Sequence, residues 1–98
     1  LCVVYCPHTT AAVTINENAD SSVQTDIVGK LSKLVPEGEG YSHAEGNSDS
    51  HIKSAIIGNS RIVLVQGKKL VLGNWEGIFF CEFDGPRERK LIVSVLSE

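Results

Sequence analysis

The chain has 98 residues, 42% of them apolar, which suits one small globular domain and excludes two. Its net charge is −3 and its nine lysines and arginines are scattered except at residues 87–90, so we expect no nucleic-acid partner. No apolar run approaches the roughly 20 residues that cross a bilayer and no signal peptide is recognisable, so we expect a soluble, cytoplasmic protein without a membrane partner.

The first residues predict a strand followed by a polar corner. Residues 1–6, LCVVYC, suit a buried strand, Pro7 interrupts it, and residues 11–16 resume with good strand propensity. The simplest interpretation is two strands joined through PHTT at residues 7–10. Because the first strand begins without a methionine or any lead-in, we expect this chain to be the remainder of a longer one.

A helix is predicted next, over residues 22–34. Its apolar residues recur at helical spacing and form one stripe: Val23, Ile27, Leu31 and Leu34. Ser21 and Gln24 have the spacing of a capping box at its start, and Pro36 ends it. Residues 36–48 then read as a polar loop, longer than the usual connection of about 4 to 6 residues.

A second, short helix should follow this loop and end at Gly58. Its first residues offer side-chain caps for the free backbone amides: Ser48, Asp49 or Ser50. Its apolar residues predict a stripe that faces inward: Ile52, Ala55 and Ile56. The loop therefore delivers its polar residues to a helix N-terminus.

The remainder of the chain predicts strands, at residues 61–66, 70–72, 76–83 and 90–96. The sequence thus predicts one α+β domain over residues 1–98, with a mainly antiparallel sheet, one longer helix and one short helix. The three cysteines, Cys2, Cys6 and Cys81, lack disulfide or zinc spacing and are expected to be reduced thiols in the core.

Residues 43–51 place polar side chains at every second position. These side chains can accept hydrogen bonds or bind a cation: His43, Glu45, Asn47, Asp49 and His51. Neutral imidazoles and carboxylates suit zinc or another divalent ion. The same residues also suit an ordinary loop that leads into a capped helix, and the pattern leaves both interpretations open.

Three further positions have both a functional and a structural interpretation. His8 can be a third metal ligand, a general base or a hydrogen-bonded turn residue. Arg87 and Arg89 follow Asp84 in a tight turn, where arginines suit phosphate but can equally be solvated charges. Trp75 lies between two glycines and can wall a pocket or pack in the core.

Three segments together resemble the YjbQ-like family. They are PHTTAAVTINENAD at residues 7–20, HAEGNSDSHIKSAIIGNS at residues 43–60 and LGNWEGIFFCEFDGPRERK at residues 72–90. The likeness covers almost the whole chain in the same order. It implies an α+β fold of the YjbQ-like type, a homotrimer, and a strand and a helix that normally precede the position of Leu1.

The resemblance also implies an activity, that of a secondary thiamine-phosphate synthase, which joins hydroxymethylpyrimidine diphosphate to a thiazole phosphate. A divalent metal ion, zinc or magnesium, would be held by His8, His43 and His51. The implied catalytic residues are His8, Asp49 and Glu45. The implied substrate-binding residues are Thr9, Thr10, Asn47, Trp75 and Arg87. The family's other recurring polar positions fall on Asn16, Glu17, Asn18 and Asp84. The alternative is a metal-dependent hydrolase or a metabolite-binding protein of unknown substrate.

Overall fold

Short strands and two helices make up the computed structural model, which describes residues 1–97. The elements follow one another in the order β1 (Cys2–Tyr5), β2 (Ala11–Glu17), α1 (Ser21–Leu34), α2 (Ser48–Ile57), β3 (Ser60–Val63), β4 (Val65–Gln66), β5 (Lys69–Leu70), β6 (Glu76–Glu82) and β7 (Ile92–Val95). Every strand pair is antiparallel. The predicted α+β class, with one longer and one shorter helix, is confirmed.

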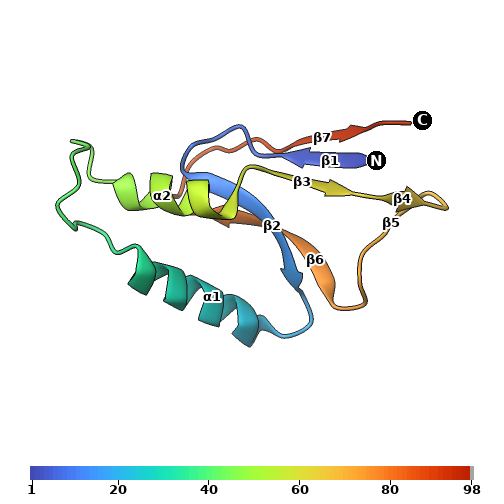
Figure 1. The fold of residues 1–98 in the computed structure, drawn as a ribbon, viewed down its shortest axis with the longest axis horizontal. Coiled ribbons are helices and arrows are strands. Elements are labelled where there is room, and N and C mark those ends of the chain that lie inside the picture. Colours follow the sequence, from blue (N-terminus) through green and yellow to red (C-terminus); the bar gives the residue numbers. More distant parts are fainter. Residues whose placement is uncertain (98) are drawn as a thin grey trace.

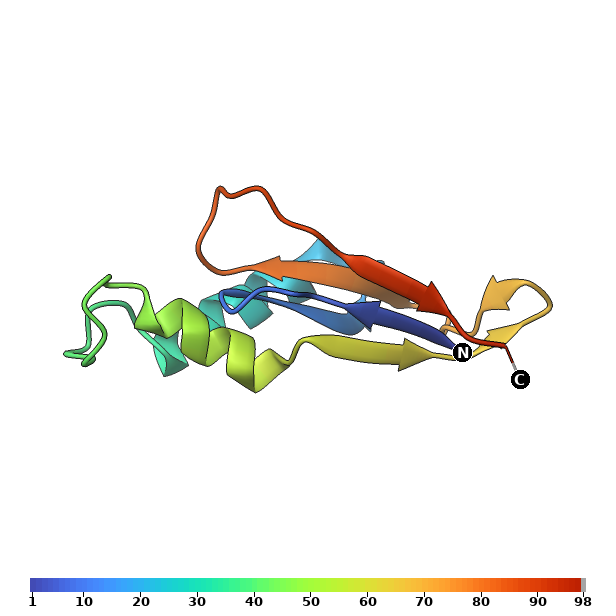
Figure 2. The same cartoon turned by 90° about the horizontal axis from the view of Figure 1, so that it is seen from above.

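The strands form two layers and a small hairpin instead of one continuous sheet. β1 is the middle strand of a three-stranded sheet in the order β3-β1-β7. β2 and β6 form a two-stranded ribbon, from Ala11 opposite Glu82 to Glu17 opposite Glu76. The β4–β5 hairpin lies at one end of the molecule, near the N-terminus (Figures 1 and 2). The predicted strand over residues 61–66 is therefore divided between the sheet and the hairpin.

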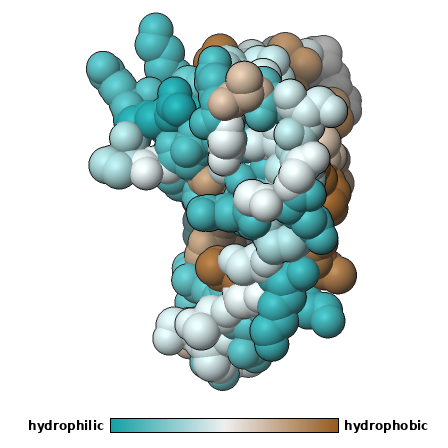
Figure 3. Space-filling model, turned by 90° about the vertical axis from the view of Figure 1, so that its left-hand side faces the viewer, coloured by the Kyte–Doolittle hydropathy of each residue, from teal (hydrophilic) through white to brown (hydrophobic). Residues whose placement is uncertain are grey.

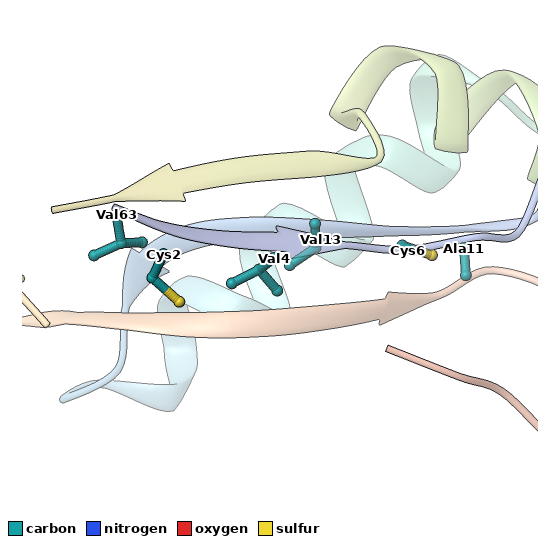
Figure 4. Packing of buried hydrophobic residues seen from close by; sticks show 6 residues of the cluster. All are labelled: Cys2, Val4, Cys6, Ala11, Val13 and Val63. Carbon is teal, nitrogen blue, oxygen red and sulfur yellow. The ribbon is translucent and has the colours of Figure 1, made fainter. Parts of the chain in front are cut away.

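The core lies between the three-stranded sheet and the β2–β6 ribbon. Six buried residues form it: Cys2, Val4, Cys6, Ala11, Val13 and Val63 (Figure 4). Most of these side chains are small, so the two layers can approach each other closely. The cysteines are free thiols, with Cys2 and Cys6 buried and Cys81 half-buried, and burial raises the pKa of Cys81. The predicted core position is thus confirmed for Cys2 and Cys6.

β7 forms one edge of the three-stranded sheet and is exposed along its length. Successive side chains of this strand point to opposite faces, yet Ile92 is 50%, Val93 56% and Val95 68% exposed. Ile62, on the outward face of β3, is 65% exposed. This sheet therefore presents both an apolar edge and an apolar outer face to solvent.

α1 confirms the predicted first helix to within one residue, but its start differs. The carboxylate of Asp20 accepts hydrogen bonds from the backbone N–H of Ser22 at 2.9 Å and from its hydroxyl at 2.6 Å. The hydrogen bond from the Ser22 hydroxyl, followed by that from its amide, lowers the pKa of Asp20. Asp20 is thus the N-cap, and the capping box predicted at Ser21 and Gln24 is wrong.

The same helix lies along the β2–β6 ribbon, on the side away from the three-stranded sheet (Figure 1). None of its residues is buried. Within residues 1–97, neither helix has the length and apolar character needed to cross a membrane.

α2 turns its polar face inward, the reverse of the prediction. Ile52 is 37% and Ile56 60% exposed, and Ala55 is exposed as well, so the stripe predicted to face the core faces solvent. The buried residues of the helix are Asp49, Ser50, Lys53 and Ser54. The Ser50 hydroxyl donates to the Phe83 carbonyl at 2.6 Å and the Ser54 hydroxyl to the Ala11 carbonyl at 2.6 Å. These hydrogen bonds fix α2 against the ends of β2 and β6.

The predicted N-terminal caps of α2 are not found, whereas its predicted C-terminal end is confirmed. Asn47 occupies the N-cap position and its side chain makes no capping hydrogen bond, so the caps predicted at Ser48, Asp49 or Ser50 are wrong. Their side chains are instead available for contacts with other elements. Gly58, with a φ of 100°, ends the helix as predicted.

Candidate functional site

A polar cleft of about 330 Å³ opens where three segments of the chain converge. The β1–β2 corner, the loop and first turn of α2, and the β6–β7 connection line it with Pro7, His8, Thr9, Thr10, Glu45, Asn47, His51, Arg87 and Arg89. The end of the molecule that carries these segments is mainly hydrophilic (Figure 3). Seven of the predicted site residues thus share one cleft, and Arg89, which sequence reasoning placed only in a charged turn, joins them.

Arg89 joins the β6–β7 connection to the β1–β2 corner. Its Nε donates to Glu82 Oε1 at 2.7 Å and its Nη2 to Glu82 Oε2, and Nη2 also donates to Thr10 Oγ1 at 2.9 Å. The Arg89 side chain is only 12% exposed. Its hydrogen bond lowers the pKa of Glu82, and Glu82 in turn raises the pKa of Arg89. Both groups therefore stay charged, and the guanidinium is a fixed part of the cleft wall.

Arg87 is held at the mouth of the cleft by Asp84. Its Nη2 donates to Asp84 Oδ2 at 2.7 Å and its Nε to the Asp84 carbonyl at 3.0 Å. Asn47 Nδ2 donates to the same Oδ2 at 2.9 Å. The hydrogen bonds from Asn47 and then Arg87 lower the pKa of Asp84. One carboxylate thus orients a residue from the α2 loop and a residue from the β6–β7 connection.

His8 is held in the cleft wall through its ring. Its Nε2 accepts a hydrogen bond from the backbone N–H of Lys90 at 2.9 Å, and its carbonyl accepts one from Asn59 Nδ2 at 2.9 Å. Because Nε2 accepts, the neutral ring carries its proton on Nδ1. His8 therefore pins the β6–β7 connection in this conformation, and its catalytic role stays a prediction.

His43 and His51 lie together, as predicted. Their rings are edge to face, with centroids 5.3 Å apart and planes at 80°. Within residues 1–97, however, no three His, Cys, Asp or Glu side chains come together as a group that could hold a metal ion. His8 also has its Nε2 engaged by Lys90. The described chain does not assemble the three-histidine ligand set, and metal binding stays a prediction.

Three predicted site residues do not line the cleft: Asp49, Trp75 and His43, whose ring contacts that of His51. Asp49 is 3% exposed and its Oδ2 pairs with Lys53 Nζ at 3.2 Å. Trp75 is 65% exposed and its carbonyl accepts from the backbone N–H of Asn18 at 2.7 Å, at the far end of the β2–β6 ribbon. β6 has seven residues and spans roughly 20 Å, so Trp75, at its far end, does not share the cleft with His8. Asn16 and Glu17 belong to that far end as well.

Comparison with known proteins gives one consistent result. The profile described as UPF0047 protein YjbQ-like matches residues 1–98. The UPF0047 protein MJ1081 of Methanocaldococcus jannaschii is 51% identical over 98 residues, which are 100% of this chain and 71% of that protein.

Solved structures agree with the sequence comparison. A crystal structure from Clostridium acetobutylicum, described as an uncharacterized conserved protein of the YjbQ/UPF0047 family, has a TM-score of 0.95 and 52% identity and covers 97% of this chain and 74% of its own. The conserved hypothetical protein TT1486 of Thermus thermophilus has a TM-score of 0.92 and 40% identity, over 97% of this chain and 76% of its own.

Proposed function

The chain belongs to the UPF0047 YjbQ-like family, and we propose that its polar cleft binds a small phosphate-bearing metabolite. The observation that carries this proposal is the pair of arginines, Arg87 and Arg89, in one wall of the cleft. Each uses Nε and Nη2 for hydrogen bonds within the protein, and Nη1 of each has no acceptor among residues 1–97. Guanidinium N–H groups bind phosphate oxygens well.

Size and free donor groups support the same ligand class. A cleft of about 330 Å³ is in the usual range for small-molecule sites. Asp84 and Glu82 pair with the two guanidinium groups, and Glu45 adds a carboxylate to the lining, so the support comes from the free guanidinium N–H groups and not from the net charge. The neighbouring Thr10 and His51 add side chains that can hydrogen-bond to the ligand.

For the reaction, we propose a cytoplasmic transferase of the thiamine-phosphate synthase type, in which hydroxymethylpyrimidine diphosphate is joined to a thiazole phosphate and diphosphate leaves. Arg87 and Arg89 would stabilise the negative charge that develops on the leaving diphosphate. His51 and Glu45, from the first turn of α2 and the loop before it, are the side chains available to move a proton there. A divalent ion, zinc or magnesium, would supply further positive charge when bound.

A metal-dependent hydrolase or a metabolite-binding protein would use the same cleft. One observation favours the binding alternative, because Asp49, which the sequence proposed as catalytic, is paired with Lys53 and does not line the cleft. The two functions differ in whether diphosphate is released from the thiamine precursors.

Replacing Arg87 with alanine is expected to weaken the binding of inorganic diphosphate about tenfold, since one guanidinium donor group is lost. The fold should persist because the Arg87 side chain is 54% exposed. Isothermal titration calorimetry measures the affinity, and Lys30→Ala, which removes the same charge from the exposed side of α1, is the matched control. Equal affinities for Arg87→Ala and the unaltered protein would contradict the proposal.

The activity needs a separate measurement. Release of diphosphate from the two thiamine precursors supports the transferase. Tight diphosphate binding without release, and without hydrolysis of phosphomonoesters in the presence or absence of metal, supports the metabolite-binding alternative.

We also propose that the chain assembles as a homotrimer. The exposed apolar face and edge of the β3-β1-β7 sheet support it, with Ile62 65% and Val95 68% exposed. Light scattering should give three times the chain mass of 10.6 kDa, and Ile62→Lys should lower it. Leu34→Lys, at a position 64% exposed on α1, should leave the mass unchanged. A single-chain mass for the unaltered protein would rule the trimer out.

A further inference from the structure

A second cavity, of about 390 Å³, lies between α1 and the β2–β6 ribbon. Apolar side chains line it from both sides, with Ile27 and Leu31 from α1 and Phe79 and Phe83 from the ribbon side. Phe79 belongs to β6 and Phe83 directly follows the last residue of that strand, so about four extended residues, roughly 13 Å, separate them. The cavity shares no lining residue with the polar cleft, so it is a separate site.

The helix beside this cavity, α1, has 14 residues, none of them buried. An isolated helix of that length is marginal in water and is normally stabilised by packing of its apolar face. Ile27 and Leu31, on the apolar face of α1, are only half-buried and line the cavity. An occupant would supply the missing contacts.

Lys53 indicates what chemical group the occupant carries. This side chain lines the cavity from α2, and the residue is only 9% exposed. An ammonium group has three N–H donors, and among residues 1–97 only one acceptor, Asp49 Oδ2, meets them. A buried donor without an acceptor costs about 1–3 kcal/mol. A hydrogen-bond acceptor on a ligand would remove that cost.

The volume suits a small molecule, because cavities of about 300 Å³ and more are typical of small-molecule sites.

We propose that this cavity binds a small aromatic molecule that carries a carboxylate or carbonyl group. Its rings lie between the Ile27–Leu31 side of α1 and the Phe79–Phe83 face of the ribbon, where aromatic contacts are favourable. Its acceptor group bonds to Lys53. The distance along the ribbon suits two fused rings.

2-Naphthoate is the probe that tests this site, with binding measured by calorimetry or by the change in naphthalene fluorescence. The unaltered protein should bind it, and Ile27→Trp, which fills the cavity from α1, should weaken binding at least tenfold. Thr25→Trp, on the exposed side of the same helix, is the matched control and should bind normally. Because Ile27 is not buried, the variant is expected to fold.

Two further measurements test the acceptor and the independence of the site. 2-Naphthylmethylamine, which has the same rings and no acceptor, should bind at least tenfold more weakly than 2-naphthoate. Inorganic diphosphate should not displace 2-naphthoate, because the polar cleft is separate. Equal affinities of the two tryptophan variants, equal binding of the amine, displacement by diphosphate, or a smaller assembly mass for Ile27→Trp alone would each overturn the proposal.

Discussion

Replacing Lys53 with methionine is expected to destabilise the protein by about 3–5 kcal/mol, because the Asp49 carboxylate would remain buried without its counter-charge. The two side chains are 11% and 5% exposed, and Nζ and Oδ2 are 3.2 Å apart. The burial decides the magnitude, since an exposed pair at the same helical spacing contributes only about 0.3–0.5 kcal/mol. Urea denaturation of both proteins gives the difference in the free energy of unfolding.

A double replacement provides the decisive control for this pair. Asp49→Leu combined with Lys53→Met removes both charges and should recover most of the stability that the single change loses. Lys30→Met removes an exposed lysine from α1 and should change the free energy of unfolding by less than about 0.5 kcal/mol. A loss in Lys53→Met no larger than that in Lys30→Met would show that removing Lys53 does not leave a costly unpaired charge at Asp49.

Replacing Arg89 with methionine is expected to cost about 2–4 kcal/mol. The change removes two hydrogen bonds to the Glu82 carboxylate, one to Thr10 Oγ1 and one to the Thr10 carbonyl, and it leaves the acceptors of Thr10 buried. Arg89→Lys keeps the charge but not the paired geometry, so its stability should lie between those of the unaltered protein and Arg89→Met. Arg87→Met is the matched control, because the Arg87 side chain is 54% exposed and its loss should cost less than about 1 kcal/mol.

The same hydrogen bonds make the stability depend on pH. The Arg89 guanidinium lowers the pKa of Glu82 in the folded protein below the ordinary 4.5. The resulting stabilisation is present above about pH 4.5 and is lost as the pH falls through the lowered folded value. The free energy of unfolding should therefore decline on acidification below that pH, and it should decline less steeply in Arg89→Met than in the unaltered protein or in Lys30→Met, where the Glu82 contact is kept. Parallel curves for Arg89→Met and Lys30→Met would contradict the assignment.

The sequence predicted those elements whose pattern is local. The strand at residues 76–83 and the first helix follow from alternation and helical spacing, and the structure confirms both. α2 was predicted with the wrong face inward because its contacts are not local. Its serines bond to the carbonyls of Ala11 and Phe83, 43 and 33 residues away, and no periodicity in ten residues encodes those partners.

The candidate site, like α2, depends on contacts between segments that are far apart in the sequence. The motif at residues 72–90 is continuous in sequence, yet its middle is the extended strand β6. At about 3.3 Å per residue this strand spans roughly 20 Å, with Trp75 before its first residue and Asp84 beyond its last. The corner at His8 and the loop at Asn47 reach the cleft because turns, unlike strands, gather their residues at one end. A continuous motif is therefore not a continuous site.

Arg89 shows what additional signal the sequence contains. Glu82 and Arg89 are seven residues apart on either side of a tight turn, a spacing that brings opposite charges together only if the chain reverses there. The reversal depends on tertiary contacts such as that of Lys90 with His8. The sequence shows the opposite charges of Glu82 and Arg89, but it does not show that the chain brings them into contact.

The exposed edge formed by β7 also affects how the isolated polypeptide behaves at high concentration. A strand with free backbone N–H and C=O groups and apolar side chains on both faces can act as a template for another strand, and stacked strands of this kind build fibrils. The run from Ile92 to Val95 contains no charge or proline that would oppose such stacking. A partner that covered β7 would therefore also protect the chain from cross-β aggregation.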